Sequence, residues 1–145
     1  MIYTELTKIA MQISFDAHKD CKDRGGAPYI FHPMHIAEQM QTEKEICVAL
    51  LHDVIEDSDI TAEQLADAGF PSDVVTAVVL LTHSADEPYF AYIERIKGCP
   101  LAKKVKIADL RHNLDTTRLK WQNESVYERL GKYRQALAML TGCEC

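Results

Sequence analysis

The sequence predicts an all-α protein of about six to eight helices, because apolar residues recur at helical spacing almost throughout. The clearest apolar stripe steps by four, three, four and four residues along Ile2, Leu6, Ile9, Ile13 and Ala17. No convincing alternation of apolar and polar residues is present, and no Asn-Gly or Asp-Gly pair marks a hairpin turn. Residues 1–145 are therefore expected to form a single helical domain with short connections.

Caps and breakers predict the first helix boundaries. The apolar stripe predicts a first helix, and two glycines and a proline within Asp23–Pro28 form a loop after it. A capping box at Thr42–Glu45 opens a helix that is predicted to run through Asp57. A second box at Thr61–Gln64 opens a short helix that Gly69 ends.

Prolines and glycines mark the later helices. Pro71 is expected in the first turn of a valine-rich helix. Pro88–Lys97 is predicted as another helix, closed by Gly98, and Pro100 starts a helix through at least Leu114. A last amphipathic helix follows from the spacing of Val126, Leu130, Tyr133, Leu137 and Leu140.

Composition disfavours several classes of protein. The chain has 16 Lys and Arg against 22 Asp and Glu, a net charge of −6, which disfavours a non-specific nucleic-acid binder. No stretch suits a membrane span of about 20 residues, and the start of the chain lacks the features of a secretory signal. The five cysteines show no disulfide pattern, and a terminal metal clip at Cys143 and Cys145 is disfavoured because zinc sites usually use two spaced pairs. We expect a cytoplasmic protein that binds neither nucleic acid nor membranes; the oligomeric state stays open.

Four ionisable residues follow the apolar run Ile46–Leu51. His52-Asp53 comes directly after the run, and Glu56-Asp57 comes after two further apolar residues. A carboxylate removed from water is costly unless it is paired, hydrogen-bonded or bound to a metal. The segment alone is equally consistent with a histidine that caps a carbonyl and an aspartate in an ion pair.

Two other segments offer similar chemistry. His32 follows a Gly-Gly-x-Pro loop and precedes Pro33, so a stiff loop could fix its imidazole, although such a histidine is more often structural. Helical spacing also places polar residues on one helix face, which is either solvated or lines a cleft. These residues are Lys106, Asp109, Asn113 and Thr116.

Two imidazoles and two carboxylates from three separate segments suit a divalent first-row metal such as manganese, iron or zinc, with positions open for water and substrate. The set is His32, His52, Asp53 and Asp109. It lacks the thiolates of a closed structural zinc site. Such a metal lowers the pKa of bound water and polarises a phosphoryl oxygen. Glu56 lies one turn after His52 and could act as the base beside it.

The positive charge is unevenly distributed. Eight of the 16 basic residues lie between Arg95 and Lys120, where Asp109 and Asp115 are the acids. A local basic field beside a metal suits a small phosphorylated polyanion. A solvated basic helix face is the alternative.

With these residues assembled, the sequence resembles the HD-domain metal-dependent phosphohydrolases, named for a His-Asp doublet. More narrowly, it resembles the hydrolase domain of the RelA/SpoT-type alarmone enzymes and the small alarmone hydrolases. The resemblance covers a core of about residues 15–140. The stretches that carry it are Ala17-His18, Gly26–Pro33, Ala49–Asp57, Leu81-Thr82 and Val105–Asn113.

The resemblance implies a helical HD-domain bundle that binds one divalent ion, usually manganese, through His32, His52, Asp53 and Asp109. It implies Glu56 and Asp57 as the pair that activates the attacking water. The candidate substrate contacts are Arg24, Asn113 and Thr116, with Lys106 on the same helix face as Asn113. The implied reaction removes the 3′-pyrophosphate from guanosine tetra- or pentaphosphate, (p)ppGpp, giving GDP or GTP and pyrophosphate. The length leaves no room for a synthetase domain, so no synthesis is expected.

Four positions depart from the family pattern. Asp23 stands where a basic residue is usual, Cys21 replaces a Gln, Gly25 replaces a small hydroxyl residue, and Leu110 replaces an Arg. An acid at position 23 would repel a phosphorylated ligand if it pointed inward. The alternatives are therefore an HD phosphohydrolase that acts on another nucleotide or phosphorylated cofactor, and a nucleotide-sensing module without turnover. The intact water-activating pair speaks against the sensing module.

Overall fold

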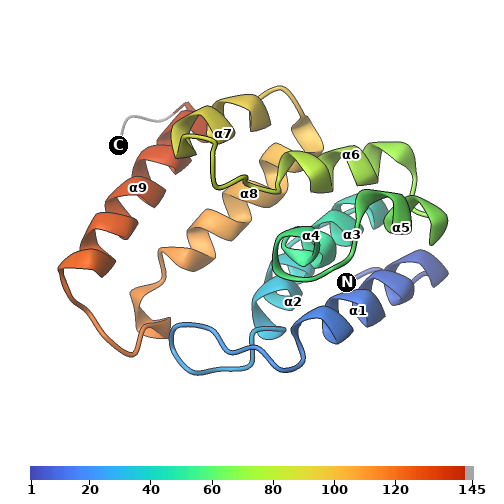
Figure 1. Cartoon of the computed structure of the whole chain (residues 1–145), viewed down its shortest axis with the longest axis horizontal. Helices are drawn as coiled ribbons and strands as arrows, with labels where there is room; N and C mark the ends of the chain where they lie inside the picture. Colours follow the sequence, from blue (N-terminus) through green and yellow to red (C-terminus); the bar gives the residue numbers. More distant parts are fainter. Residues whose placement is uncertain (143–145) are drawn as a thin grey trace.

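A computed structural model describes residues 1–142, so Cys143 and Cys145 lie outside the described residues. The described residues form eight α-helices of six to eighteen residues, the four-residue helix α4 and a short 3-10 helix, η1 (Figure 1). The prediction of an all-α bundle is confirmed. In chain order the bounds are α1 Glu5–His18, α2 Phe31–Glu38, α3 Glu43–Leu51, α4 Val54–Asp57, α5 Ala62–Asp67, α6 Ser72–Leu80, α7 Tyr89–Ile96, α8 Pro100–Asn113, η1 Thr116–Arg118 and α9 Glu124–Thr141.

Threonine side chains start three of these helices. Thr42 and Thr61 form the two predicted capping boxes, and Thr4 forms a third at the start of α1. Each threonine oxygen accepts a backbone N–H three residues on, which contributes about 1 kcal/mol to helix stability. Pro71 lies immediately before α6 as its N-cap, rather than in its first turn.

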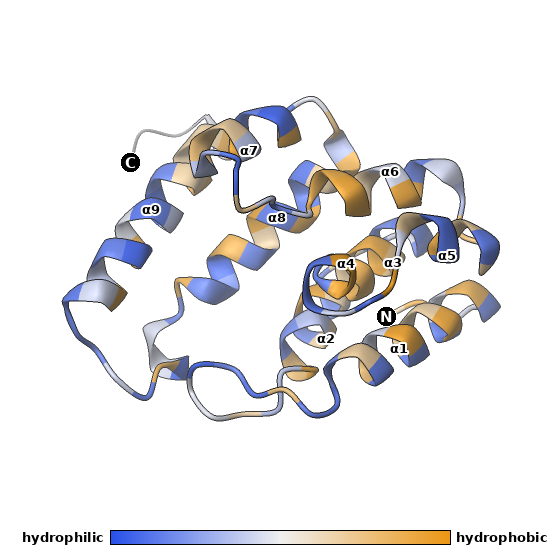
Figure 2. Ribbon diagram, in the orientation of Figure 1, coloured by the Kyte–Doolittle hydropathy of each residue, from blue (hydrophilic) through white to orange (hydrophobic). Residues whose placement is uncertain are grey.

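Helix α3 lies at the centre of the fold. Its residues Ile46–Leu51 are fully buried, and the helix contacts α1, α2, α6 and α8. Burial raises the pKa of Cys47, within this run, to about 12, which fits a cysteine that serves as a small apolar residue. Figure 2 shows apolar residues concentrated on α3 and α6, whereas α9 alternates between polar and apolar along its length. Because full burial of each Leu or Ile contributes about 1.5–3 kcal/mol, α3 firmly positions the residues at its C-terminal end.

The predicted helix through Asp57 is interrupted, and this prediction was wrong. Helix α3 ends at Leu51 and α4 begins at Val54. The Ala49 carbonyl, which in a continuing helix would accept the N–H of Asp53, lies 2.6 Å from His52 Nδ1. A side chain that competes for a backbone acceptor in this way favours a helix end.

The expected stiff loop around His32 was also wrong, because His32 lies in the first turn of α2. Pro33 fits this turn since the first N–H groups of a helix have no acceptor within the helix. The imidazole is therefore positioned by a helix rather than by a loop.

Helices α7, α8 and α9 pack together on one side of the molecule, and α1 to α5 gather on the other (Figure 1). Helix α8 also contacts α2 and α3, and Asp109 in its C-terminal half lies beside His32 at the start of α2 and His52 at the α3–α4 junction. The candidate metal ligands lie where these helices meet. None of the helices in residues 1–142 is long and apolar enough to cross a membrane.

Candidate functional site

His32, His52 and Asp109 meet in a buried cluster formed by α2, the end of α3 and α8. One potential ligand atom of each lies within 4.8 Å of the others. His32 Nε2 lies 2.8 Å from Asp109 Oδ1, and His52 Nε2 lies 3.6 Å from the same oxygen. The fold thus brings together three of the four residues that the sequence suggested as metal ligands.

Asp53, the fourth, adds a second carboxylate at the edge of this cluster. Its Oδ2 lies 3.0 Å from His52 Nε2 and accepts a hydrogen bond from the Tyr29 hydroxyl. Burial alone would raise the pKa of Asp53, but His52 lowers it to about 2, so Asp53 is a carboxylate. Tyr29 was not predicted as a site residue. Its only sequence signal is its place in the motif stretch Gly26–Pro33.

The donor set fits a divalent cation. The Ala49 carbonyl accepts from His52 Nδ1, so a neutral His52 offers the lone pair of Nε2. Nε2 is buried and has no well-aligned hydrogen-bond partner among the described residues. Burial lowers the pKa of His52, yet Asp53 and Asp109 raise it well above its usual range. A site that attracts a proton so strongly also attracts a metal, which competes with protons for the same ligand atoms.

Asp109 is fixed by two further residues of α8. Its Oδ2 accepts from Lys106 Nζ at 2.8 Å, and its Oδ1 accepts from Asn113 Nδ2 at 3.1 Å. Burial opposes ionisation of Asp109, but Lys106 and both histidines hold its pKa well below the usual range. In turn, Asp109 outweighs the burial of Lys106 and raises the pKa of that lysine. The ion pair keeps both groups charged inside the protein.

Two carboxylates follow on α4, at Glu56 and Asp57. Glu56 Oε1 accepts the backbone N–H of His83 at 2.6 Å, which fixes this side chain. Partial burial raises the pKa of Glu56. Partial burial also raises the pKa of Asp57, to about 6, and the negative charges of Asp53 and Glu56 add to this shift. A base whose pKa lies near the working pH is suited to accept a proton during turnover.

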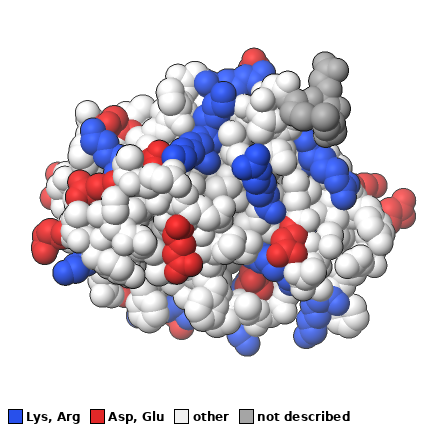
Figure 3. Space-filling model, turned by 180° about the vertical axis from the view of Figure 1, so that it is seen from behind, with Lys and Arg blue, Asp and Glu red and all other residues white. Residues whose placement is uncertain are grey.

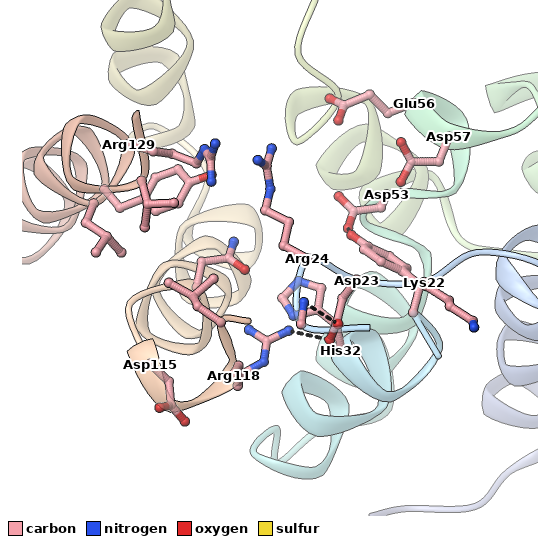
Figure 4. A pocket seen from close by; sticks show the side chains of 17 residues that line it. Lys22, Asp23, Arg24, His32, Asp53, Glu56, Asp57, Asp115, Arg118 and Arg129 are labelled. Carbon is pink, nitrogen blue, oxygen red and sulfur yellow. Dashed lines mark hydrogen bonds and ion pairs between the residues drawn. The ribbon is translucent and has the colours of Figure 1, made fainter. Parts of the chain in front are cut away.

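A cavity of about 390 Å³ opens beside the cluster. Asp53, Glu56 and Asp57 line one side, and Arg24 and Arg129 direct their guanidinium groups into the space opposite (Figure 4). The other cations in its lining are Lys22 and Arg118. Guanidinium groups bind phosphate oxygens through paired hydrogen bonds. The cavity can therefore hold a small phosphorylated molecule next to the carboxylates.

The structure separates the four predicted substrate contacts. Arg24 lines the large cavity, whereas Lys106 lines a neighbouring cavity of about 180 Å³. Asn113 lines both, and its amide is already bonded to Asp109. Thr116 lines neither of the two cavities, because α8 ends at Asn113 and Thr116 begins η1. The roles of these residues in binding stay predictions.

The acid at position 23 does not stand free in the cavity. Asp23 Oδ1 accepts the backbone N–H groups of Gly25 and Ala27, both at 2.9 Å. Its Oδ2 lies 3.4 Å from Arg118 Nη2, an ion pair drawn in Figure 4. Asp23 therefore folds its own loop and joins it to η1, and Arg118 offsets its charge.

Gly25 is required by a close approach between this loop and η1. A Cβ at position 25 would lie 1.8 Å from the carbonyl oxygen of Arg118. Only glycine fits there without movement of the backbone. Of the other two departures from the family pattern, Cys21 is exposed and Leu110 is fully buried in the core.

Gly25→Ala is expected to lower the melting temperature, because the loop must move away from η1 at a cost of about 1–3 kcal/mol. Gly98→Ala is the matched control, since Gly98 is exposed and a Cβ there approaches only the Arg95 carbonyl, at 3.9 Å. Thermal denaturation of both variants measures the difference. Equal melting temperatures would contradict the close contact.

The basic stretch between Arg95 and Lys120, predicted as a local basic field beside the metal or as a solvated helix face, lies only partly at the site. Of its eight cations, Lys106 and Arg118 line the two cavities. Three others form ion pairs elsewhere: Arg95–Glu87, Lys97–Glu94 and Lys104–Glu45. On the face seen in Figure 3, basic and acidic side chains are interspersed. Apart from Arg118, the cations of the 390 Å³ cavity come from outside the stretch: Lys22 and Arg24 lie in the loop after α1, and Arg129 lies in α9.

No protein-family model matches the chain. A solved structure described as "A metazoan ortholog of SpoT hydrolyzes ppGpp and plays a role in starvation responses" matches with a TM-score of 0.79. The match covers 97% of this chain and 87% of that chain, at 19% identity.

Curated proteins named guanosine-3′,5′-bis(diphosphate) 3′-pyrophosphohydrolase are also similar. The Mus musculus protein, MESH1, is 32% identical over 129 residues, or 77% of this chain and 70% of its own length. The Danio rerio MESH1 is 36% identical over 104 residues, or 64% of this chain and 57% of its own length. A Vibrio cholerae protein is 44% identical over 70 residues, or 46% of this chain and 10% of its own length. The chain thus spans a tenth of the Vibrio cholerae relative and just over half of the Danio rerio one.

The helical fold and the buried His-Asp cluster, together with the sequence similarity to the MESH1 proteins, define an HD-type, RelA/SpoT-like domain. Within this class, the extent of the match to the Mus musculus protein decides the family. The chain belongs to the guanosine-3′,5′-bis(diphosphate) 3′-pyrophosphohydrolase family.

Proposed function

We propose that the chain is a metal-dependent phosphohydrolase that removes the 3′-pyrophosphate from guanosine tetra- or pentaphosphate, giving GDP or GTP and pyrophosphate. The buried cluster of imidazoles and carboxylates beside an arginine-lined cavity is the observation that carries this proposal. Family membership narrows the substrate, because the similar proteins are named for this reaction. In this proposal residues 1–145 act as one HD hydrolase domain.

His32, His52, Asp53 and Asp109 are the proposed ligands of one divalent ion. Manganese is the proposed metal, with iron and zinc as alternatives, because mixed imidazole and carboxylate ligands suit these ions. When bound, the ion lowers the pKa of a water molecule and polarises a phosphoryl oxygen. Tyr29 supports this set by holding Asp53 through its hydroxyl.

In the proposed reaction, a water oxygen bonds to the phosphorus carried by the ribose 3′ oxygen, and the bond between that phosphorus and the 3′ oxygen breaks. Glu56, fixed by the His83 N–H, and Asp57 accept the proton that the water loses. The carboxylate pair passes this proton on to the 3′ oxygen as that oxygen leaves, so the pair returns to its charged form. The pKa of Asp57, about 6, supports this role near neutral pH.

The basic side chains of the cavity are the proposed phosphate contacts. Arg24 and Arg129 point into the space beside the carboxylates, where they can offset the charge of a polyphosphate (Figure 4). Asn113, Thr116 and Lys106 stay in the proposed substrate-binding set. For Asn113, any change would also disturb Asp109, because the two side chains are hydrogen-bonded.

Turnover is expected to rise with pH through about 6, because Asp57 must lose its proton to act as a base. The folded pKa of Asp57 lies above its ordinary value of 3.8, so the folded chain holds this proton more tightly than the unfolded chain. Asp57 therefore makes stability fall as the pH rises from about 4 to about 6.

Asp57→Asn removes this destabilising charge. The variant is expected to melt at a higher temperature than wild type at neutral pH while its turnover falls. A pH–rate profile and thermal denaturation check both effects. A profile that stays flat across this range in wild type, or a lower melting temperature in the variant, would contradict the assignment.

A turnover screen with added manganese tests the proposed function. Purified chain is incubated with guanosine tetraphosphate, with GTP, and with other phosphorylated nucleotides and cofactors. Guanosine tetraphosphate is expected to yield GDP and pyrophosphate in equal amounts, and GTP is expected to remain intact. Release of phosphate or pyrophosphate from other compounds alone would overturn the choice of substrate.

A second candidate is a phosphohydrolase for another nucleotide or phosphorylated cofactor. The Asp23–Arg118 pair at the cavity wall favours it, because the resemblance places a basic residue where Asp23 stands. Nucleotide binding without turnover of any compound would instead favour a sensing module.

A further inference from the structure

His112 lies against the outer edge of His32. The Nδ1 atoms of the two rings are 2.7 Å apart, the ring planes differ by 5°, and the centroids are 5.0 Å apart. Rings that are nearly parallel and approach through their nitrogens at this distance share a hydrogen bond, so one Nδ1 donates and the other accepts. His112 lies one turn after Asp109 on α8. It lines neither cavity described above.

A cation bound at the cluster would set the direction of this hydrogen bond, because it would replace the proton that His32 Nε2 otherwise donates to Asp109. His32 Nε2 faces the cluster, 2.8 Å from Asp109 Oδ1. To give its Nε2 lone pair to a cation, a neutral His32 must carry its proton on Nδ1. That proton then points at His112 Nδ1, which must accept it. Since two donors cannot face each other at 2.7 Å, His112 in the cation-bound site would carry its own proton on Nε2.

The two histidines of the cluster are thus fixed differently. His52 donates from Nδ1 to the Ala49 carbonyl, which can only accept. His32 has His112 at the equivalent position, and an imidazole accepts only in one tautomer. On its other side His112 stacks on the exposed ring of His35, at 4.0 Å between centroids. This contact helps to hold the ring of His112 in place.

We propose that His112 is a positioning residue for the metal centre: it accepts the Nδ1 proton of His32 and so fixes the tautomer that presents Nε2 to a divalent ion. This inference rests on the metal site proposed above, but not on the identity of the substrate. Residues that orient a metal-bound histidine in this way typically contribute about 10- to 100-fold to metal affinity. A merely structural role in packing would not require an acceptor at this position.

Manganese titration by calorimetry, in the absence of substrate, tests the inference. His112→Phe keeps a ring against His35 but removes the acceptor, and we expect it to weaken manganese binding by about 10- to 100-fold. His112→Asn places an amide oxygen near the position of Nδ1 and is expected to restore most of the affinity. His35→Phe is the matched control, because it leaves the His112–His32 hydrogen bond intact, and it should bind as wild type does.

Nuclear magnetic resonance of wild-type protein with isotopically labelled histidine gives a second readout that needs no variant to fold. In the zinc-loaded protein, we expect His32 to carry its proton on Nδ1 and His112 to carry its proton on Nε2. Wild-type affinity in His112→Phe, or a proton on His112 Nδ1, would overturn the inference. A wild-type chain that binds neither manganese nor zinc would overturn the proposed metal site as well. Failure to hydrolyse guanosine tetraphosphate, with metal binding intact, would overturn only the proposed substrate.

Discussion

Glu56→Gln is expected to lower kcat by about 10²–10⁴-fold, the usual contribution of a positioned general base. Glutamine keeps the size of the side chain and can still accept the N–H of His83, but it cannot take a proton from water. Manganese content and KM should stay near wild type, because the lost interaction acts mainly in the transition state. Steady-state kinetics and metal analysis of the same preparation measure both.

Glu63→Gln is a matched control for this substitution, since Glu63 is an exposed glutamate on the short helix α5. It should leave kcat unchanged. If Glu56→Gln loses its manganese instead, Glu56 is a metal ligand and the proposed set of four ligands is wrong.

His52→Ala and Asp109→Ala are each expected to abolish manganese binding. A ligand that binds only the folded state stabilises it, by about 2.7 kcal/mol when its concentration is 100 times Kd. Wild type should therefore melt at a higher temperature with manganese, and neither variant should respond to the metal. Thermal denaturation with and without manganese measures this difference within each protein.

Comparing the melting temperature of each variant with and without manganese separates the loss of metal binding from the loss of stability that truncating the side chain causes. That cost is large for Asp109→Ala, because Lys106 loses its buried partner, and breaking such a pair costs about 3–5 kcal/mol. Asp109→Asn offers a second variant that keeps hydrogen-bonding atoms at this position. Wild-type manganese affinity in these variants would show that the cluster is not the metal site.

The fold was predictable where local signals decide it. The apolar run Ile46–Leu51 and the threonine caps Thr42 and Thr61 define their helices through burial and hydrogen bonds between near neighbours. The break after Leu51 was not predictable from periodicity, because it depends on where the His52 ring finds its acceptor.

Residue type and motif order suggested the members of the cluster. Their contact was not visible in the sequence, because His32 and Asp109 lie far apart along the chain and only the fold brings them to 2.8 Å. The cavity walls were less predictable. Arg129 lies in a helix that looks like any amphipathic surface helix, and nothing local indicates that α9 turns it toward the site. The Asp23–Arg118 pair depends likewise on how the loop after α1 meets η1.

A crystal structure grown with manganese and measured at the manganese absorption edge tests the central claim most directly. We predict a single strong anomalous peak within bonding distance of His32 Nε2, His52 Nε2, and one carboxylate oxygen each of Asp53 and Asp109. Lys106 and Asn113 should still contact Asp109 around it, as they do in the present structure. A peak elsewhere, or no peak at a manganese concentration that supports turnover, would contradict the proposed metal centre.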